Sequence, residues 1–245
     1  MALPKIDVPI YEAALPSNNQ VVKFRPFLVK EQKLLLMASQ SSEIEEVIGS
    51  IKQALKNCLI SELDIDVLPV FDLEFLFLNL RARSVGEVVN VTYKCNNVLS
   101  VDPEGNQNIC PGSQKFDINV LEINPKFGEG HTNKIMITDN LGIVMKYPSF
   151  EIMQKFQGKN EEEILFELII KCIDYIFDKD NIYYVKDLEK DEINEFIDSM
   201  QQQHLEKIKA FFDTMPKISK ELDFNCSKCG FEEKINLEGV QSFFG

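Results

Sequence analysis

Four of the six cysteines occupy positions that suit a metal ion: Cys95, Cys110, Cys226 and Cys229. The second pair belongs to the segment Cys226-Ser227-Lys228-Cys229-Gly230, in which a tight turn directs two thiolates at one ion. Strand-like runs precede both pairs, at residues 87–94 and 220–225. A tetrahedral zinc ion takes four soft ligands and often draws them from two such turns. The spacing therefore predicts a structural zinc site that joins the middle of the chain to its end.

Two other interpretations of these cysteines stay open at this point. Residues 1–7 lack the apolar core of a signal peptide, so we expect a cytosolic protein whose thiols stay reduced. A redox Cys-x-x-Cys opens a helix in a thioredoxin-like unit, whereas residues 231–237 are typical of a return strand. Structural zinc is therefore favoured over a redox motif and over cysteines that bind nothing.

The inventory of catalytic residues is small. The chain has no Gly-x-Ser-x-Gly, no phosphate-binding glycine loop and no His-Glu-x-x-His. Its two histidines are His131, a candidate metal ligand or partner contact in a Gly-rich loop, and His204, expected on the solvated face of a helix. Cys58 and Cys172 fall on apolar helical stripes and are expected in the core. Nothing raises the abundant acids above background as paired catalytic groups, so we predict a protein that is not an enzyme.

Composition excludes several classes of partner. The 245 residues carry a net charge of −13, which argues against a nucleic-acid surface because phosphate binding needs concentrated Lys and Arg. No apolar run approaches the roughly 18 residues of a membrane-spanning helix, so no membrane insertion is expected. The acidity favours solubility, or a basic protein as partner. Formation of a homo-oligomer stays open.

The elements that must position the cysteines follow from periodicity and turn residues. We expect a hairpin over residues 10–27, helices over 28–39, 42–59 and 70–83, and strands over 87–94 and 115–120, with a polar loop at 96–113. A second hairpin is expected at residues 134–147, with a short helix capped by Ser149 after it. Further helices are expected over residues 160–176, 186–200 and 202–213, a strand at 182–185 and a terminal strand pair at 218–237.

This order predicts an α+β fold: a mixed or antiparallel β-sheet with packed helices and a zinc-ribbon-like cysteine knuckle. Because the cysteines must meet, we expect the β segments to converge on one sheet of a single domain over residues 1–245. Within it, residues 1–95 and 215–245 would form one subdomain. Residues 96–214 would form an insertion with a β-hairpin and an acidic helical region. The apolar tail, Phe243 and Phe244, either folds back or binds a partner.

Several segments together resemble a known family. They are residues 23–36 with Arg25-Pro26-Phe27, residues 77–87 with Arg81-Ala82-Arg83-Ser84, Tyr93-Lys94-Cys95, the 226–230 knuckle and the 237–244 ending. The combination is similar to the baseplate hub and hub-assembly proteins of T4-like contractile-tailed bacteriophages, mainly over the first hundred residues. The first cysteine turn departs from the compact knuckle of that family, because 14 residues separate Cys95 from Cys110. That spacing predicts a looser metal site, or none.

The resemblance implies a non-enzymatic structural or assembly protein of the tail baseplate hub. It would act through contacts with other baseplate and hub proteins in the host cytoplasm during assembly, and whether it then stays in the virion tail is left open. Two alternatives stay open: a hub-associated cell-wall hydrolase, which would need paired acids or a zinc ion with an open position, and a zinc-ribbon binding module of unrelated role.

Overall fold

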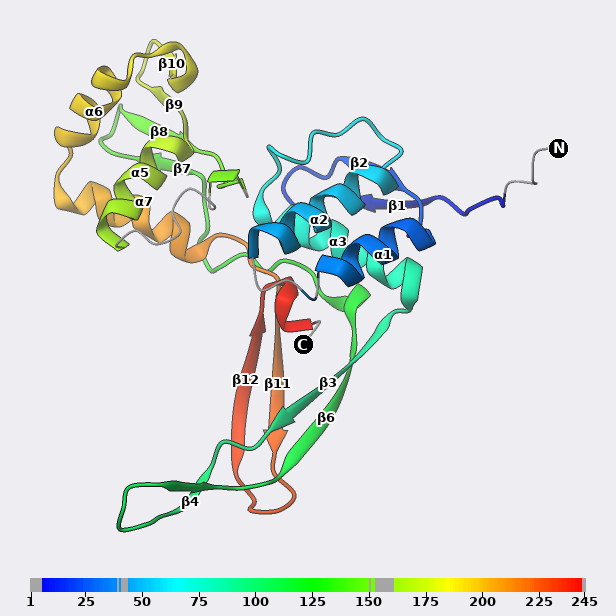
Figure 1. Ribbon diagram of the computed structural model, residues 1–245. Coiled ribbons are helices and arrows are strands. Elements are labelled where there is room, and N and C mark those ends of the chain that lie inside the picture. Colours follow the sequence, from blue (N-terminus) through cyan, green and yellow to red (C-terminus); the bar gives the residue numbers. More distant parts are fainter. Residues whose placement is uncertain (1–5, 39, 41–43, 150, 153–160, 244–245) are drawn as a thin grey trace. The chain divides into compact units, whose positions relative to one another are not determined.

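The computed structural model describes residues 6–38, 40, 44–149, 151–152 and 161–243 (Figure 1). The chain divides into two compact units. The first unit contains residues 1–65, 71–125 and 217–245, and the second contains residues 66–70 and 126–216. Helices and strands occur in both, and every strand pairing is antiparallel. The predicted α+β class is therefore confirmed.

The first unit begins with a hairpin and a group of helices, as predicted. The elements are β1 (Tyr11–Ala14), β2 (Val21–Phe24), α1 (Val29–Ala38), α2 (Ile44–Cys58) and α3 (Val70–Val85). The third helix buries its apolar side chains on several faces, including Leu73, Leu76 and Leu80, which explains its continuous hydrophobic sequence. Ser42, the predicted cap of α2, lies outside the described residues.

Long two-stranded ribbons complete the first unit. Strand β3 (Val88–Lys94) pairs with β6 (Ser113–Asn119), and β11 (Ser219–Asn225) pairs with β12 (Glu232–Glu238). Side chains connect the two ribbons: the Asn225 N–H donates to Gln114 Oε1 at 2.7 Å, and the rings of Tyr93 and Phe224 meet edge to face at 5.7 Å. A short 3₁₀ turn, η1 (Val120–Glu122), follows β6, and η3 (Val240–Phe243) follows β12.

The prediction of a polar loop at residues 96–113 is wrong. This segment contains a further hairpin, formed by β4 (Val98–Val101) and β5 (Gln107–Ile109). Asp102 organises its turn, because one carboxylate oxygen accepts the N–H groups of Glu104 and Asn106 at 3.0 and 2.8 Å. In an Asx-type turn, the aspartate side chain makes the hydrogen bonds that reverse the chain. The polar residues of this segment therefore did not indicate a strand pair.

The second unit is a four-stranded sheet covered by helices. The strands β7 (Lys134–Met136), β8 (Gly142–Met145), β9 (Ile173–Phe177) and β10 (Ile182–Tyr184) lie in the order β10-β9-β8-β7. The helical elements are α5 (Glu161–Cys172), η2 (Val185–Asp187), α6 (Lys190–Asp198) and α7 (Gln202–Thr214). Their apolar faces share one core, which includes Ile143, Ile169, Ile173 and Ile208.

Two helix predictions in this unit are wrong in extent. The helix expected to continue to residue 176 ends at Cys172, because Ile173–Phe177 pairs with β8 as a strand. The run of β-branched and aromatic residues at Ile173–Phe177 is compatible with a helix or a strand by local sequence. Pairing with β8 makes it a strand. The helix expected from residue 186 begins at Lys190 with a capping box between Glu189 and Glu192. Ser149 Oγ accepts the Ile152 N–H at 3.4 Å, but residues 153–160 lie outside the described part.

The expectation of one common sheet is also wrong. The described strands form five separate sheets, four of them two-stranded ribbons (Figure 1). Among the described residues, each ribbon strand of the first unit pairs with only one other strand. Side chains, rather than backbone ladders, then join ribbon to ribbon. The cysteines can therefore meet without a continuous sheet between them.

Candidate metal centre

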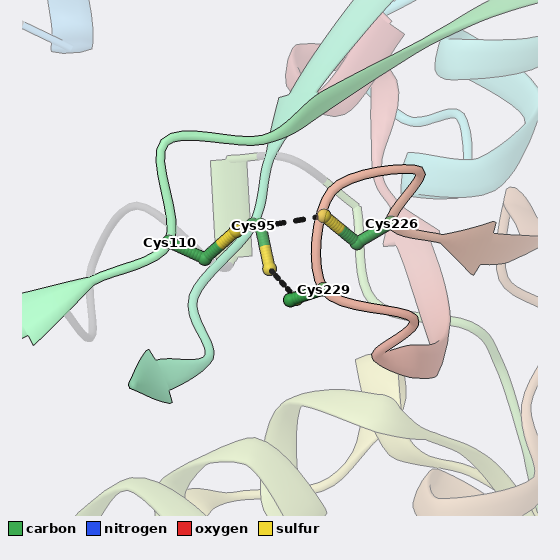
Figure 2. A group of neighbouring side chains, drawn as sticks. All are labelled: Cys95, Cys110, Cys226 and Cys229. Atoms are coloured by element: carbon green, nitrogen blue, oxygen red, sulfur yellow. Dashed lines mark hydrogen bonds between the residues drawn. The ribbon is translucent and has the colours of Figure 1, made fainter. Parts of the chain in front are cut away.

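The ends of the two long ribbons bring the four predicted cysteines together (Figure 2). Cys95 directly follows β3, Cys110 directly follows β5, and Cys226 and Cys229 lie in the turn between β11 and β12. Three of the four are buried, and Cys229 is partly exposed. All four belong to the first unit.

Two of the separations between the sulfur atoms match those of a tetrahedral metal site. Cys95 Sγ lies 3.7 Å from Cys229 Sγ, and Cys110 Sγ lies 3.7 Å from Cys226 Sγ. All four lie within 4.8 Å of one another. Zn–S bonds of about 2.3 Å in tetrahedral geometry place the sulfurs about 3.8 Å apart. These distances exceed a disulfide bond length of about 2.05 Å, and all four cysteines are free thiols.

The long spacing between the first two cysteines does not open the site. Cys110 N–H donates to Asn97 O at 2.9 Å, and Cys95 N–H donates to Gly112 O at 2.8 Å. The intervening residues leave the site as the β4–β5 hairpin and return to it, so backbone hydrogen bonds place Cys95 opposite Gly112 and Cys110 opposite Asn97. The hairpin therefore brings Cys110 back to the other three cysteines despite the long spacing, and whether the metal site is looser stays a prediction.

The second pair is held by a compact turn. Cys226 N–H donates to Phe231 O at 2.9 Å, and Gly230 N–H donates to Cys226 O at 2.8 Å. Gly230 has a φ of +70°, a left-handed conformation that glycine adopts without steric cost. This arrangement is the knuckle predicted from the sequence, and it directs both thiols to the same point.

The environment of the thiols differs across the site. Burial raises the pKa of Cys95 to about 12 and also raises the pKa of Cys110. A hydrogen bond from the Phe231 backbone lowers the pKa of Cys229 to about 6, and Asn97 Nδ2 adds a contact to its sulfur at 3.6 Å. Metals bind thiolates, so a cation bound here would hold the four sulfurs in their deprotonated form.

Gly112 permits the close approach of the two ribbons. A Cβ at this position would lie 2.3 Å from Cys226 Sγ and 3.3 Å from Cys110 Sγ. Replacing Gly112 with alanine is therefore expected to displace Cys226 and to weaken metal affinity about 10- to 100-fold, as the loss of an outer contact of a metal site does. Competition against a chromophoric chelator measures this change.

Gly49 provides the control for that substitution. It lies on α2, no atom would lie within 4 Å of an added Cβ, and its φ is not positive. The Gly49→Ala variant should bind the metal like the wild-type chain. Equal affinities of the Gly112 and Gly49 variants would contradict the proposed geometry.

The other sequence candidates lie elsewhere. His131, in the second unit, has Nδ1 2.9 Å from Thr214 Oγ1 and Nε2 2.9 Å from the Tyr147 hydroxyl, and it stacks on Tyr147 and Phe211. Burial lowers its pKa, which keeps the ring neutral near pH 7. His131 thus belongs to an aromatic cluster and not to the cysteine group. His204 Nδ1 accepts the Gln201 N–H at the start of α7.

The two remaining cysteines are core residues, as predicted. Cys58 and Cys172 are both buried, and burial raises their pKa values to about 11 and about 12. Of the predicted partner-binding tail, the Phe243 side chain and Phe244 lie outside the described residues. The start of that tail is anchored in the first unit: Val240 is buried, and its N–H donates to Glu74 Oε1 at 3.1 Å.

The segments that suggested a family by sequence have structural roles. Arg25 Nη2 lies 3.0 Å from an oxygen of the fully buried Glu31 and donates to Asn57 O at 2.7 Å. Ser84 Oγ accepts the Phe27 N–H at 2.8 Å and so connects the start of α1 to the end of α3. Glu31 was not identified from the sequence as the buried partner of Arg25. The signal was the pair of opposite charges six residues apart.

Fold and site together define an α+β protein in which β-ribbons bring four cysteines close enough to hold a metal ion. A family model described as T4 bacteriophage base plate protein matches residues 8–245. The chain belongs to this family and is therefore related to proteins of the phage baseplate over nearly its whole length. Neither the curated proteins nor the solved structures gave a significant match. No helix among the described residues is long and apolar enough to cross a membrane.

Proposed function

We propose that this chain is a non-enzymatic component or assembly factor of the baseplate hub, acting through contacts with other baseplate proteins. The observation that carries the proposal is the family match over residues 8–245. It covers both units, so the relationship does not rest on the metal-binding turns alone. The resemblance of residues 23–36 and 77–87 to hub proteins adds the hub as the specific location.

The cysteine centre supports a structural role. A catalytic zinc ion keeps one position open for water or substrate, whereas four thiolates occupy every position of a tetrahedral ion. We infer that the ion is zinc, because soft sulfur ligands at tetrahedral separations favour it over oxygen-seeking cations. The bound ion would fasten the β3–β6 ribbon to the β11–β12 ribbon, and it supplies no reaction. The competing hydrolase hypothesis has no comparable support in the described residues.

The charge of the chain agrees with a protein partner. A net charge of −13 favours basic proteins over nucleic acid and opposes close self-association, so a homo-oligomer is the weaker form of the proposal. Assembly would take place in the host cytoplasm and deliver the protein to the virion tail. We propose the Phe243-Phe244 tail as a second contact, because Val240, shortly before it, is held in the first unit by its hydrogen bond to Glu74.

The direct test is binding between purified proteins. The full-length chain, purified without chelator, is immobilised, and each baseplate and hub protein of the same phage is passed over it separately. We expect at least one hub protein to bind with a dissociation constant of about 1 μM or lower. The proposal is wrong if none binds, or if the chain digests purified peptidoglycan. A variant lacking residues 243–245 tests the tail, since the same partner should then bind more weakly.

A further inference from the structure

The β4–β5 hairpin is an unpartnered element that the metal centre does not require. A short loop would join Cys95 to Cys110 equally well, yet the chain extends into two further strands. Every residue of β4 and β5 is exposed, and among the described residues neither strand pairs with a third. An isolated two-stranded ribbon is marginally stable in water and gains little by itself. Beyond returning the chain to Cys110, this hairpin therefore lacks an evident role within its own unit.

The register gives the hairpin one apolar face. Val98 pairs with Ile109 and Val101 pairs with Gln107, whereas Ser100 pairs with Asn108 between them. Residues directly opposite share a face, and alternate pairs point to opposite faces. Val98, Val101 and Ile109 thus lie on one face, together with Gln107, and Ser100 and Asn108 lie on the other. Val101 is 59% exposed and Ile109 is 49% exposed, so the apolar face is open to solvent.

The edges of the hairpin are also unprotected. Exposed edge strands usually carry lysine, proline or inward charges that prevent pairing with another chain. The neighbouring β11–β12 ribbon follows this rule, with the ion pairs Lys234–Glu221 and Lys217–Glu238 along it. Strands β4 and β5 contain no charged residue and no proline. The register shift at Leu99 disturbs β4, so β5 presents the regular edge.

The base of the hairpin is rigid where it meets the cysteine centre. Cys110 N–H donates to Asn97 O, and Asn97 Nδ2 contacts Cys229 Sγ. Asn96 Nδ2 also donates to Glu233 Oε2 at 3.1 Å, which attaches the base to β12. A hairpin with a fixed base loses less conformational entropy on binding than a free loop. This arrangement suits a docking element.

We propose that the β4–β5 hairpin docks an extended, basic segment of another baseplate protein. The segment adds a strand along β5 and covers the face of Val98, Val101 and Ile109, a mode in which backbone pairing gives affinity and side-chain pockets give specificity. The charge selects this occupant: residues 96–109 contain Asp102 and Glu104 and no Lys or Arg. A second copy of the chain is disfavoured by its net charge of −13. The inference rests on the proposed function and adds the chemistry of the partner.

The test compares two variants with the same change in charge. Val101→Lys places a cation on the apolar face, whereas Ser100→Lys places it on the opposite face of the same strand. The probes are the baseplate proteins that bind the wild-type chain and overlapping peptides of about 15 residues from them. We expect Val101→Lys to weaken binding at least about tenfold and Ser100→Lys to weaken it less than about threefold. The peptides that bind should have apolar residues at alternate positions and should carry Lys or Arg. Unchanged far-ultraviolet circular dichroism and unchanged urea unfolding midpoints show that both variants fold.

The outcomes separate the two proposals. If a baseplate protein binds wild type and Val101→Lys equally, or if the bound peptides are acidic, the hairpin proposal is wrong and the proposed function stands. If no baseplate protein binds the wild-type chain, both fail. Sedimentation could also show that the wild-type chain is a dimer and that Val101→Lys, but not Ser100→Lys, makes it monomeric. The occupant of the hairpin would then be a second copy of the chain, and the proposed basic segment would be wrong.

Discussion

The double variant Cys226→Ser, Cys229→Ser is expected to lose its metal and to loosen both long ribbons of the first unit. Serine removes two of the four sulfur ligands, and the remaining pair cannot hold an ion with comparable affinity. Structural zinc contributes on the order of 10 kcal/mol of apparent binding energy in small modules. The helical part of the first unit has its own buried core, so only part of this loss should appear as unfolding.

Two measurements check this result. Elemental analysis of the wild-type chain, purified without chelator, should give about one zinc ion per chain, and the variant should give almost none. Hydrogen exchange should show faster exchange in β3, β6, β11 and β12, because these strands lose the connection between Cys95, Cys110 and the knuckle. Amides in the second unit, such as those of Ile169 and Ile173, should exchange at the wild-type rate.

Cys58→Ala is the matched control for this variant. Cys58 is a buried cysteine of the same unit, and it lies outside the four-sulfur group. Its replacement should cost about 1 kcal/mol of packing and leave the metal content unchanged. Wild-type protein without metal would contradict the zinc proposal, and so would a double variant that retains its zinc.

The sequence predicted the convergence of the four cysteines because their chemistry limits the alternatives. Where thiols stay reduced, a Cys-x-x-Cys turn between strands has few uses other than metal binding. Cys95 and Cys110 could therefore be inferred as the other two ligands before the fold was known. The geometry confirms that the four thiols meet. Their occupation by zinc stays a prediction. The separate sheets were not predictable, since alternation in a strand shows which face is buried and not which edge is paired.

Other errors have physical causes that the local sequence does not contain. Residues 173–177 continue the apolar pattern of α5, and only the available edge of β8 makes them a strand. The β4–β5 hairpin was missed because its apolar residues are exposed and its turn depends on hydrogen bonds to Asp102. Both errors concern tertiary or side-chain contacts that override local propensity. The second error concealed the surface that we propose for docking.

Arg25→Ala is expected to produce a large loss of stability without touching the metal centre. Glu31 is fully buried, and its carboxylate accepts hydrogen bonds from Arg25 at 3.0 Å and from the Leu28 N–H at 2.9 Å. Burial opposes the charge, but these hydrogen bonds hold the pKa of Glu31 below its usual value. Removing the arginine leaves the buried carboxylate with only the exposed Lys30 as an ion partner. Breaking a buried pair typically costs about 3–5 kcal/mol.

Lys30→Ala is the control that separates the loss of a buried ion partner of Glu31 from the loss of any nearby positive charge. Lys30 Nζ lies 3.4 Å from the same Glu31 oxygen, but the lysine side chain is 66% exposed. A solvent-exposed pair of this kind contributes about 0–1 kcal/mol, so the Lys30 variant should unfold close to the wild-type midpoint. Urea unfolding followed by far-ultraviolet circular dichroism compares the variants. Equal effects of the two substitutions would contradict a buried pair.

The pH dependence gives this prediction a second, independent form. In the wild-type chain, the lowered pKa of Glu31 contributes stability that is present above the unfolded pKa and is lost only as pH falls through the folded pKa. In Arg25→Ala, desolvation without the guanidinium should raise the folded pKa above the unfolded one, so the variant is stabilised by protonation as pH falls. The stability difference should therefore narrow, by at most about 1.4 kcal/mol per pH unit, as pH falls from neutral toward the unfolded pKa of a glutamate. A difference that stays constant over this range would show that Arg25 acts through packing and not through the charge of Glu31.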